Sequence, residues 1–187
     1  MSKRAFDFLA SLAALIVLAI PIALVVIAVK LTSRGPALYW SERIGRGNGV
    51  FRMPKFRSMR VDTPVVATHL LESPDRWLTP IGGFLRKSSL DELPQLWSIL
   101  VGHMSLVGPR PALHNQHDLI ELRTRRGVHV LRPGLTGWAQ VNGRDELPIP
   151  QKVEYDAYYL EHRSFAFDLK ILAMTLAKVL RREGVAH

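Results

Sequence analysis

The chain contains no cysteine. Disulfides, thiolate nucleophiles and cysteine-ligated zinc or iron–sulfur sites are therefore excluded. Aromatic residues make up only 8% of the 187 positions, and acidic residues are also few, with 16 Asp and Glu against 25 Lys and Arg and a net charge of +9. This positive excess predicts an anionic partner, and nucleic acid, a phosphorylated metabolite and anionic lipid all meet that description.

Charge is absent from one long stretch near the start of the chain. The 22 residues from Phe8 to Val29 contain no charged side chain, and as a straight helix they would extend roughly 33 Å, enough to cross the hydrocarbon core of a bilayer. Pro21 lies near the middle of the stretch and predicts a kink or break there. Basic residues flank both ends: Lys3, Arg4, Lys30 and Arg34. The positive-inside preference thus favours a bent helix that re-enters the cytoplasm, with a straight span as the alternative.

The rest of the chain alternates short strand patterns with helix patterns. Residues 37–44 and 50–56 alternate as strands around a glycine-bearing turn and predict a small β-hairpin. Residues 165–182 place apolar side chains at helical spacing beside basic ones, which predicts an amphipathic helix that packs on the core or rests at a lipid interface. We therefore expect an α+β fold that is predominantly helical, with residues 1–35 as a membrane anchor and residues 36–187 as a separate domain.

The densest group of chemically capable residues is the segment 86–94, RKSSLDELP. Two helix starts are possible there: Ser89 and Glu92 as a capping box, or Asp91 as the N-cap residue. In both cases Asp91 lies near the positive end of a helix dipole and close to Arg86, which favours the ionised carboxylate and attracts phosphate. A carboxylate among phosphate-binding cations is well placed to attack phosphorus.

Other loops supply further donors for a phosphate. Arg110 lies between two prolines, which present its planar guanidinium rigidly. Lys55 belongs to an extended segment, and Gln140 and Arg144 belong to a glycine-bearing loop. Together these residues predict a phosphate-binding site around one carboxylate pair.

Four motifs resemble those of the bacterial sugar transferases, the small monotopic phosphoglycosyl transferases that begin glycan assembly on polyprenyl phosphate. The motifs are FRSM at 56–59, SLDELPQ at 89–95, MSLVGPRP at 104–111 and PGLTG at 133–137. They occur in the family's order, and the resemblance extends over nearly the whole chain. It implies a re-entrant anchor broken at Pro21, interfacial amphipathic helices, and a catalytic domain on the cytoplasmic face of the bacterial inner membrane.

The resemblance also implies a reaction in two steps. Asp91 attacks the phosphate of a UDP-sugar that is next to the sugar, releases UMP and carries the sugar phosphate as a covalent intermediate. Polyprenyl phosphate, normally undecaprenyl phosphate, then takes the sugar phosphate to give polyprenyl-diphosphate-sugar. We expect a UDP-sugar with an N-acetylated or deoxy-amino sugar as donor, and polysaccharide, O-antigen or glycoconjugate synthesis as the setting.

The same resemblance assigns roles to individual residues. Mg²⁺ is the expected cofactor, held by Asp91 and in one version also by Glu92, which otherwise handles a proton on the lipid phosphate. Arg86 and Arg110 are implied to hold phosphate, and Lys55, Arg144 and Gln140 complete the predicted substrate-binding set. At three positions the chain has a residue that differs from the one common in the family: Ile20, Ser98 and His103.

Two other functions compete with the transferase. One is a membrane-tethered basic module that binds anionic lipid or nucleic acid, although the chain has no recognised nucleic-acid motif and we expect no nucleic-acid partner. The other is a membrane phosphohydrolase, in which water intercepts the covalent intermediate. The sequence does not name the sugar, the glycan pathway or the oligomeric state.

Overall fold

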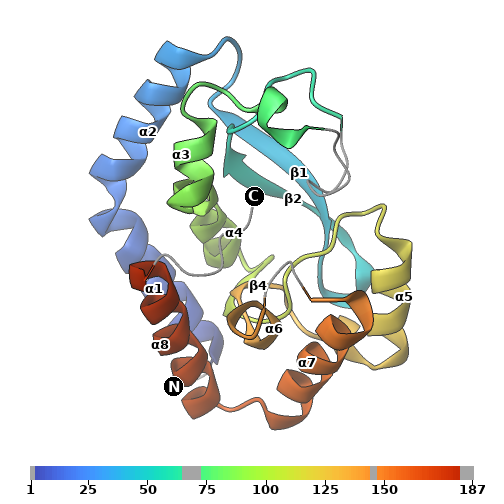
Figure 1. Ribbon diagram of the computed structural model, residues 1–187. Helices are drawn as coiled ribbons and strands as arrows, with labels where there is room; N and C mark the ends of the chain where they lie inside the picture. Colours follow the sequence, from blue (N-terminus) through green and yellow to red (C-terminus); the bar gives the residue numbers. More distant parts are fainter. Residues whose placement is uncertain (1–2, 65–72, 144–146, 182–187) are drawn as a thin grey trace.

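The structure is a computed structural model that describes residues 3–64, 73–143 and 147–181. These residues form an α+β fold made mostly of helices, as predicted, together with two small two-stranded sheets (Figure 1). The α-helices are α1 (Lys3–Val17), α2 (Ala19–Thr32), α3 (Gly82–Lys87), α4 (Gln95–Val101), α5 (His117–Arg125), α6 (Trp138–Val141), α7 (Ile149–His162) and α8 (Phe165–Arg181). The strands are β1 (Leu38–Ile44), β2 (Val50–Phe56), β3 (Ser105–Val107) and β4 (Gly134–Thr136), and short 3₁₀ helices are η1 (Arg46–Asn48), η3 (Pro74–Trp77), η4 (Leu90–Glu92) and η5 (Val128–Val130).

The first two helices meet at a bend of 62° (Figure 1). The predicted break at Pro21 is wrong by three residues, because Leu18 separates the helices and Pro21 lies in the first turn of α2. The proline still accounts for the break, since its ring would clash with the carbonyl of Val17, four residues earlier. In the first turn of α2 its missing N–H leaves few helical bonds unmade.

The bent pair carries an unusual amount of exposed apolar surface. Side chains around the bend are among the most exposed, including Val17 at 77% and Ile20 at 74%. Among the described residues, no single helix is long and apolar enough to cross a bilayer, but α1 and α2 taken together have the length and composition of a broken span or a re-entrant loop. A continuous apolar surface of this kind needs a membrane or a partner to cover it.

The predicted β-hairpin is confirmed. Strands β1 and β2 pair antiparallel, with Leu38 opposite Phe56 and Ile44 opposite Val50. Met53 and Phe56 on β2 are each 2% exposed, and β2 contacts both η4 and α4. The hairpin therefore forms a wall against which the segment containing residues 90–101 packs.

Strands β3 and β4 pair in parallel and hold two of the motif loops together. Gly134 is required at this crossing, because a Cβ atom there would lie 2.1 Å from the backbone nitrogen of Gly108. Gly137 is equally constrained, since a Cβ atom at that position would lie 2.1 Å from the carbonyl oxygen of Gly108. The glycines of the two motifs therefore permit the close backbone approach that places the Arg110 loop.

The predicted C-terminal amphipathic helix is confirmed as α8, which lies beside α1 (Figure 1). Lys3 Nζ of α1 is 2.6 Å from Asp168 Oδ2 of α8, and the rings of Phe6 and Phe165 make an edge contact at 5.1 Å. Ile171 is fully buried in the core, whereas other apolar side chains of α8 remain exposed, Leu169, Leu176 and Val179 among them. The helix thus has one core-facing side and one apolar outer side.

Candidate active site

The acidic pair lies on η4, a single 3₁₀ turn between α3 and α4. Both predicted helix starts are wrong, because Ser89 makes no capping hydrogen bond and α4 begins only at Gln95, with Pro94 as its N-cap residue. Ser89 instead adopts a left-handed conformation with φ of 56°, which turns the chain sharply before the carboxylates. Such a conformation in a non-glycine residue costs of order 1 kcal/mol and is typical of functional sites.

Three basic side chains lie around the pair, two of them from segments more than 15 residues away. Lys55 Nζ lies 3.0 Å from Glu92 Oε1 and 3.9 Å from Asp91 Oδ2. Arg110 donates a hydrogen bond to the same Glu92 oxygen at 3.2 Å. Arg86, at the end of α3, lies close enough to lower the pKa of Asp91. The site therefore holds adjacent carboxylates inside a cationic ring.

Burial dominates the electrostatics of Asp91, which is only 7% exposed. Loss of water raises its pKa above the usual value, Lys55 is the strongest opposing influence, and the neighbouring Glu92 raises the pKa further. Arg86 and Arg110 also lower the pKa, but the net direction is upward. The carboxylate is thus poorly solvated and depends on Lys55 for its charge.

The acidic pair forms part of the wall between two open cavities. Asp91 lines a cavity of about 330 Å³, called here the polar cavity because most of its lining residues are polar, Tyr39, Arg43, Lys55 and Arg86 among them. Glu92 lines an apolar cavity of about 400 Å³, built largely from aliphatic side chains that come from several segments, with three of these side chains on α8. The two neighbouring carboxylates therefore line different cavities, and only the one at Asp91 is lined by several basic residues.

The apolar cavity has a polar end at Glu92 and Arg110, which both line it and are bonded to each other. Thr136 and Gln140 are further polar lining residues, and Leu18 at the helix bend and Leu176 of α8 are part of its apolar lining. Both polar atoms of the Gln140 side chain are buried and lack a hydrogen-bond partner among the described residues.

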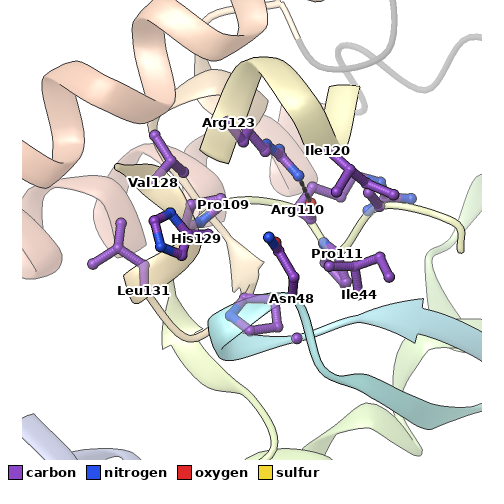
Figure 2. Close-up of a pocket in the computed structure, with 13 residues that line it drawn as sticks. Ile44, Asn48, Pro109, Arg110, Pro111, Ile120, Arg123, Val128, His129 and Leu131 are labelled. Atoms are coloured by element: carbon purple, nitrogen blue, oxygen red, sulfur yellow. Dashed lines mark hydrogen bonds between the residues drawn. The ribbon is translucent and has the colours of Figure 1, made fainter. Parts of the chain in front are cut away.

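A buried ion pair supports the Arg110 loop from behind. Arg123 of α5 bonds Asp156 Oδ2 of α7 through Nε at 2.9 Å and a terminal nitrogen at 2.6 Å, and its other terminal nitrogen donates to the carbonyl oxygen of Arg110 at 2.8 Å. Figure 2 shows Arg123 directed at the segment from Pro109 to Pro111. Burial raises the pKa of Asp156 above its usual value, against the lowering effect of Arg123.

The structure brings together most of the residues that the sequence suggested. Five of them form the charged cluster: Lys55, Arg86, Asp91, Glu92 and Arg110. Gln140 lines the adjoining apolar cavity, and Arg144 lies outside the described residues. The departures Ser98 and His103 line neither cavity; Ser98 is buried on α4 and His103 lies against the ring of Phe51.

Arg123 and Asp156 were not predicted. They lie 33 positions apart on separate helices, and nothing in either local segment marks them as partners. A helical spacing argument would only have placed both on inward faces of α5 and α7. They are connected to the site only in the tertiary structure, where Arg123 donates a hydrogen bond to the carbonyl oxygen of Arg110.

Asp91 and Glu92, at the wall of two cavities and surrounded by lysine and arginine side chains, form a functional-site candidate suited to a phosphorylated ligand. The chain is a member of the bacterial sugar transferase family, whose sequence pattern matches residues 1–182.

The relatives share the domain at substantial identity. An uncharacterized sugar transferase, EpsL, from Bacillus subtilis (strain 168) is 41% identical over 184 residues, which is 98% of this chain and 89% of EpsL. The UDP-glucose:undecaprenyl-phosphate glucose-1-phosphate transferase of Xanthomonas campestris pv. campestris is 43% identical over 166 residues, 83% of this chain and 34% of that protein. The UDP-N-acetylgalactosamine-undecaprenyl-phosphate N-acetylgalactosaminephosphotransferase of Aeromonas hydrophila is 34% identical over 187 residues, 97% of this chain and 44% of the relative. The chain thus spans nearly all of EpsL but less than half of the other two.

Proposed function

We propose that this protein transfers a sugar 1-phosphate from a UDP-sugar to polyprenyl phosphate, giving polyprenyl-diphosphate-sugar and UMP. The observation that carries this proposal is the position of the Asp91–Glu92 pair between a polar and an apolar cavity. One substrate of such a reaction is a water-soluble dianion and the other is a lipid with a phosphate at its end. The names of the Xanthomonas and Aeromonas relatives describe this kind of reaction, with glucose and N-acetylgalactosamine as the sugars.

In the first step the donor enters the polar cavity. Lys55 and Arg86 bind its diphosphate oxygens and reduce the repulsion between two anions. An oxygen of Asp91 then forms a bond to the phosphorus next to the sugar, and the bond from that phosphorus to the UMP oxygen breaks. The product is an acyl phosphate that joins the sugar phosphate to Asp91, and UMP leaves.

In the second step the acceptor phosphate lies at the polar end of the apolar cavity, with its hydrocarbon chain along the aliphatic lining. Arg110 holds the phosphate and Glu92 accepts the proton that a phosphate monoester still carries in part near neutral pH. The acceptor oxygen bonds to the phosphorus of the intermediate, and the bond from that phosphorus to Asp91 breaks. The carboxylate is regenerated and the diphosphate product is complete.

The residues present fit the expected Mg²⁺. The described residues contain no group of three or more ligating side chains, and Mg²⁺ commonly binds through one or two carboxylates plus substrate phosphates. Asp91 and Glu92 are adjacent carboxylates at the cavity wall and would hold the ion. When bound, Mg²⁺ would screen the charge of the donor diphosphate.

We also propose that α1 and α2 form a re-entrant anchor in the inner membrane and that residues 36–187 form the catalytic domain on its cytoplasmic face. The 62° bend and the exposed apolar side chains of both helices support this arrangement. It would place the open apolar cavity, lined by Leu18 at the bend, within reach of a lipid acceptor. The outer side of α8 would then rest at the interface.

The decisive experiment measures UMP release from a panel of UDP-sugars by the purified full chain with Mg²⁺, with and without polyprenyl phosphate. N-acetylated and deoxy-amino sugars are the first donors to test, followed by UDP-glucose. Release that depends on the lipid supports the transferase. Lipid-independent release of sugar phosphate identifies a phosphohydrolase. If no donor gives any release, the alternative of a membrane-tethered binding module is supported.

Intact-protein mass spectrometry tests the covalent step. Wild-type protein incubated with donor alone should gain the mass of a sugar phosphate, and Asp91→Asn should not. Asp118→Asn is the matched control, because Asp118 is an exposed carboxylate of α5 that lines neither cavity. An adduct that persists in Asp91→Asn would assign the nucleophile elsewhere.

Because the chain lacks cysteine, topology can be tested with single cysteines introduced at Ser2 and Ser33. Both should react with a membrane-impermeant thiol reagent from the cytoplasmic side. Reaction from opposite sides would show that the helices cross the membrane.

A further inference from the structure

A third cavity, of about 190 Å³, lies apart from the acidic pair and shares no lining residue with the two cavities there. It is bounded by the start of α1, by β3, by η1 and η5, and by the turn between α7 and α8. Its lining is rich in basic residues: Lys3, Arg4, Arg46, Arg132 and Arg163. The proposed transferase reaction uses none of them.

The acidic groups near this cavity are already bonded. Asp7, the carboxylate in its lining, is 2% exposed and accepts hydrogen bonds from Ser105 Oγ at 2.8 Å and from the backbone nitrogen of Leu106 at 3.1 Å. Asp168 lies nearby and is bonded to Lys3 and to the hydroxyl of Tyr159. These carboxylates therefore hold α1 and α8 against the core.

The basic groups of the cavity differ in how fully they are bonded. Lys3 is paired with Asp168, and Arg4 donates to the carbonyl oxygens of Ile99 and Leu100 at the end of α4. Arg132 uses only its Nε, on the carbonyl of Gly102. The side chains of Arg46 and Arg163 make no hydrogen bond or ion pair within the part of the chain that the structure describes.

Guanidinium groups gathered in one hollow repel one another unless an anion joins them, and phosphate oxygens are well matched to their planar donors. The cavity is therefore suited to a phosphate.

The surroundings of the cavity indicate where that phosphate comes from. Arg163 lies just before α8, which begins at Phe165, and the ring of Phe165 packs on α1. Exposed apolar side chains continue from there along both helices, with Leu9 of α1 55% exposed and Leu169 of α8 44% exposed. An apolar strip next to a basic hollow matches a molecule with hydrocarbon chains and a phosphate at one end.

We propose that this cavity binds the headgroup phosphate of an anionic membrane phospholipid that is not a substrate, with Arg46, Arg132 and Arg163 as its ligands and the α1–α8 strip against its acyl chains. The bound lipid would fix the depth and tilt of the bent helix pair at the start of α1. This site is separate from the acceptor site and does not depend on the transferase chemistry.

The test is co-flotation of the full chain with phosphatidylcholine vesicles that contain or lack phosphatidylglycerol. Wild-type protein should bind more tightly when phosphatidylglycerol is present. The double variant Arg46→Gln/Arg163→Gln should bind the phosphatidylglycerol vesicles about 30-fold more weakly than wild type, because each basic residue near an anionic surface contributes about a factor of five in affinity. Arg125→Gln/Arg126→Gln is the matched control, because it removes the same charge from exposed positions that pair with Glu121 and Glu154 on the surface.

Each outcome decides the proposal. A loss confined to Arg46→Gln/Arg163→Gln supports the site, and an equal loss in both double variants would show a diffuse electrostatic attraction instead. If inorganic phosphate at moderate concentration abolishes the phosphatidylglycerol gain at unchanged ionic strength, the cavity takes a soluble phosphate and the lipid assignment is wrong. UMP release in detergent should be the same in wild type and Arg46→Gln/Arg163→Gln, so failure here leaves the proposed transferase function standing.

Discussion

Replacing Lys55 with methionine tests the electrostatic reasoning at the acidic pair most directly. Lys55 is the strongest influence that lowers the pKa of Asp91, against burial and the neighbouring Glu92, which raise it. Methionine keeps the length of the side chain and removes its charge. The pKa of Asp91 should then rise further, so that less of the nucleophile is ionised at neutral pH.

The size of the effect follows from the 3.9 Å between Lys55 Nζ and Asp91 Oδ2. At an effective dielectric constant near 20, opposite charges at that distance attract by about 4 kcal/mol. Part of this attraction is offset because Lys55 is itself desolvated, its side chain being 16% exposed. We therefore expect kcat/KM to fall by about 10²- to 10³-fold on the acidic limb of the pH profile, where Asp91 is mostly protonated, since each 1.4 kcal/mol corresponds to tenfold.

The assay is the initial rate of UMP release with donor, Mg²⁺ and polyprenyl phosphate, measured across the neutral and alkaline range. The acidic limb of the kcat/KM profile should move to higher pH in Lys55→Met, so that activity partly recovers as the pH is raised. Lys55→Arg should keep the limb near its wild-type position, and Lys170→Met is the control, since Lys170 lies over the ring of Trp138 away from the pair. A Lys55→Met enzyme with an unshifted limb would refute the reasoning, even if its activity were low.

Three further predictions concern stability. Because the pKa of Asp91 is raised in the folded state, the folded protein binds the proton more tightly than the unfolded chain, and Asp91 lowers the free energy of unfolding as the pH rises above about 4. Asp91→Asn should therefore be inactive yet have a higher Tm than wild type at neutral pH, and the two Tm values should converge in acid. A lower Tm of the variant at neutral pH would contradict this. Gly134→Ala should lose at least about 1–3 kcal/mol, because a Cβ would lie 2.1 Å from the Gly108 nitrogen, and an unchanged Tm would show that the crossing can relax. Arg123→Met should lower the free energy of unfolding by about 3–5 kcal/mol at neutral pH, because it leaves Asp156 buried without its partner. This loss of stability should shrink as the pH falls and Asp156 is protonated. A loss independent of pH would mean that packing and not charge is responsible.

Local rules in the sequence were sufficient for the hairpin and for the C-terminal helix. The hairpin over residues 38–56 follows from alternation around glycines, and α8 follows from apolar residues at helical spacing. The helix break was placed at Pro21 rather than at Leu18, because a proline acts on the carbonyl four residues before it. The helix starts proposed for residues 89–92 failed for a related reason, since α4 begins only after Pro94 and the chain turns at a left-handed Ser89 instead.

The sequence by itself determined which chemical groups the protein has: a carboxylate pair, phosphate-binding cations, a long uncharged stretch and no thiol. Tertiary structure alone decided which of them meet. Lys55 reaches Glu92 across 37 positions because the register of the hairpin directs it there, and Arg123 reaches Arg110 only because α5 and α7 pack together. Exposed charges are largely screened beyond about 8–10 Å at physiological ionic strength, whereas charges in a buried site interact strongly. Which charges interact is therefore decided by the packing of the backbone and not by their separation along the chain.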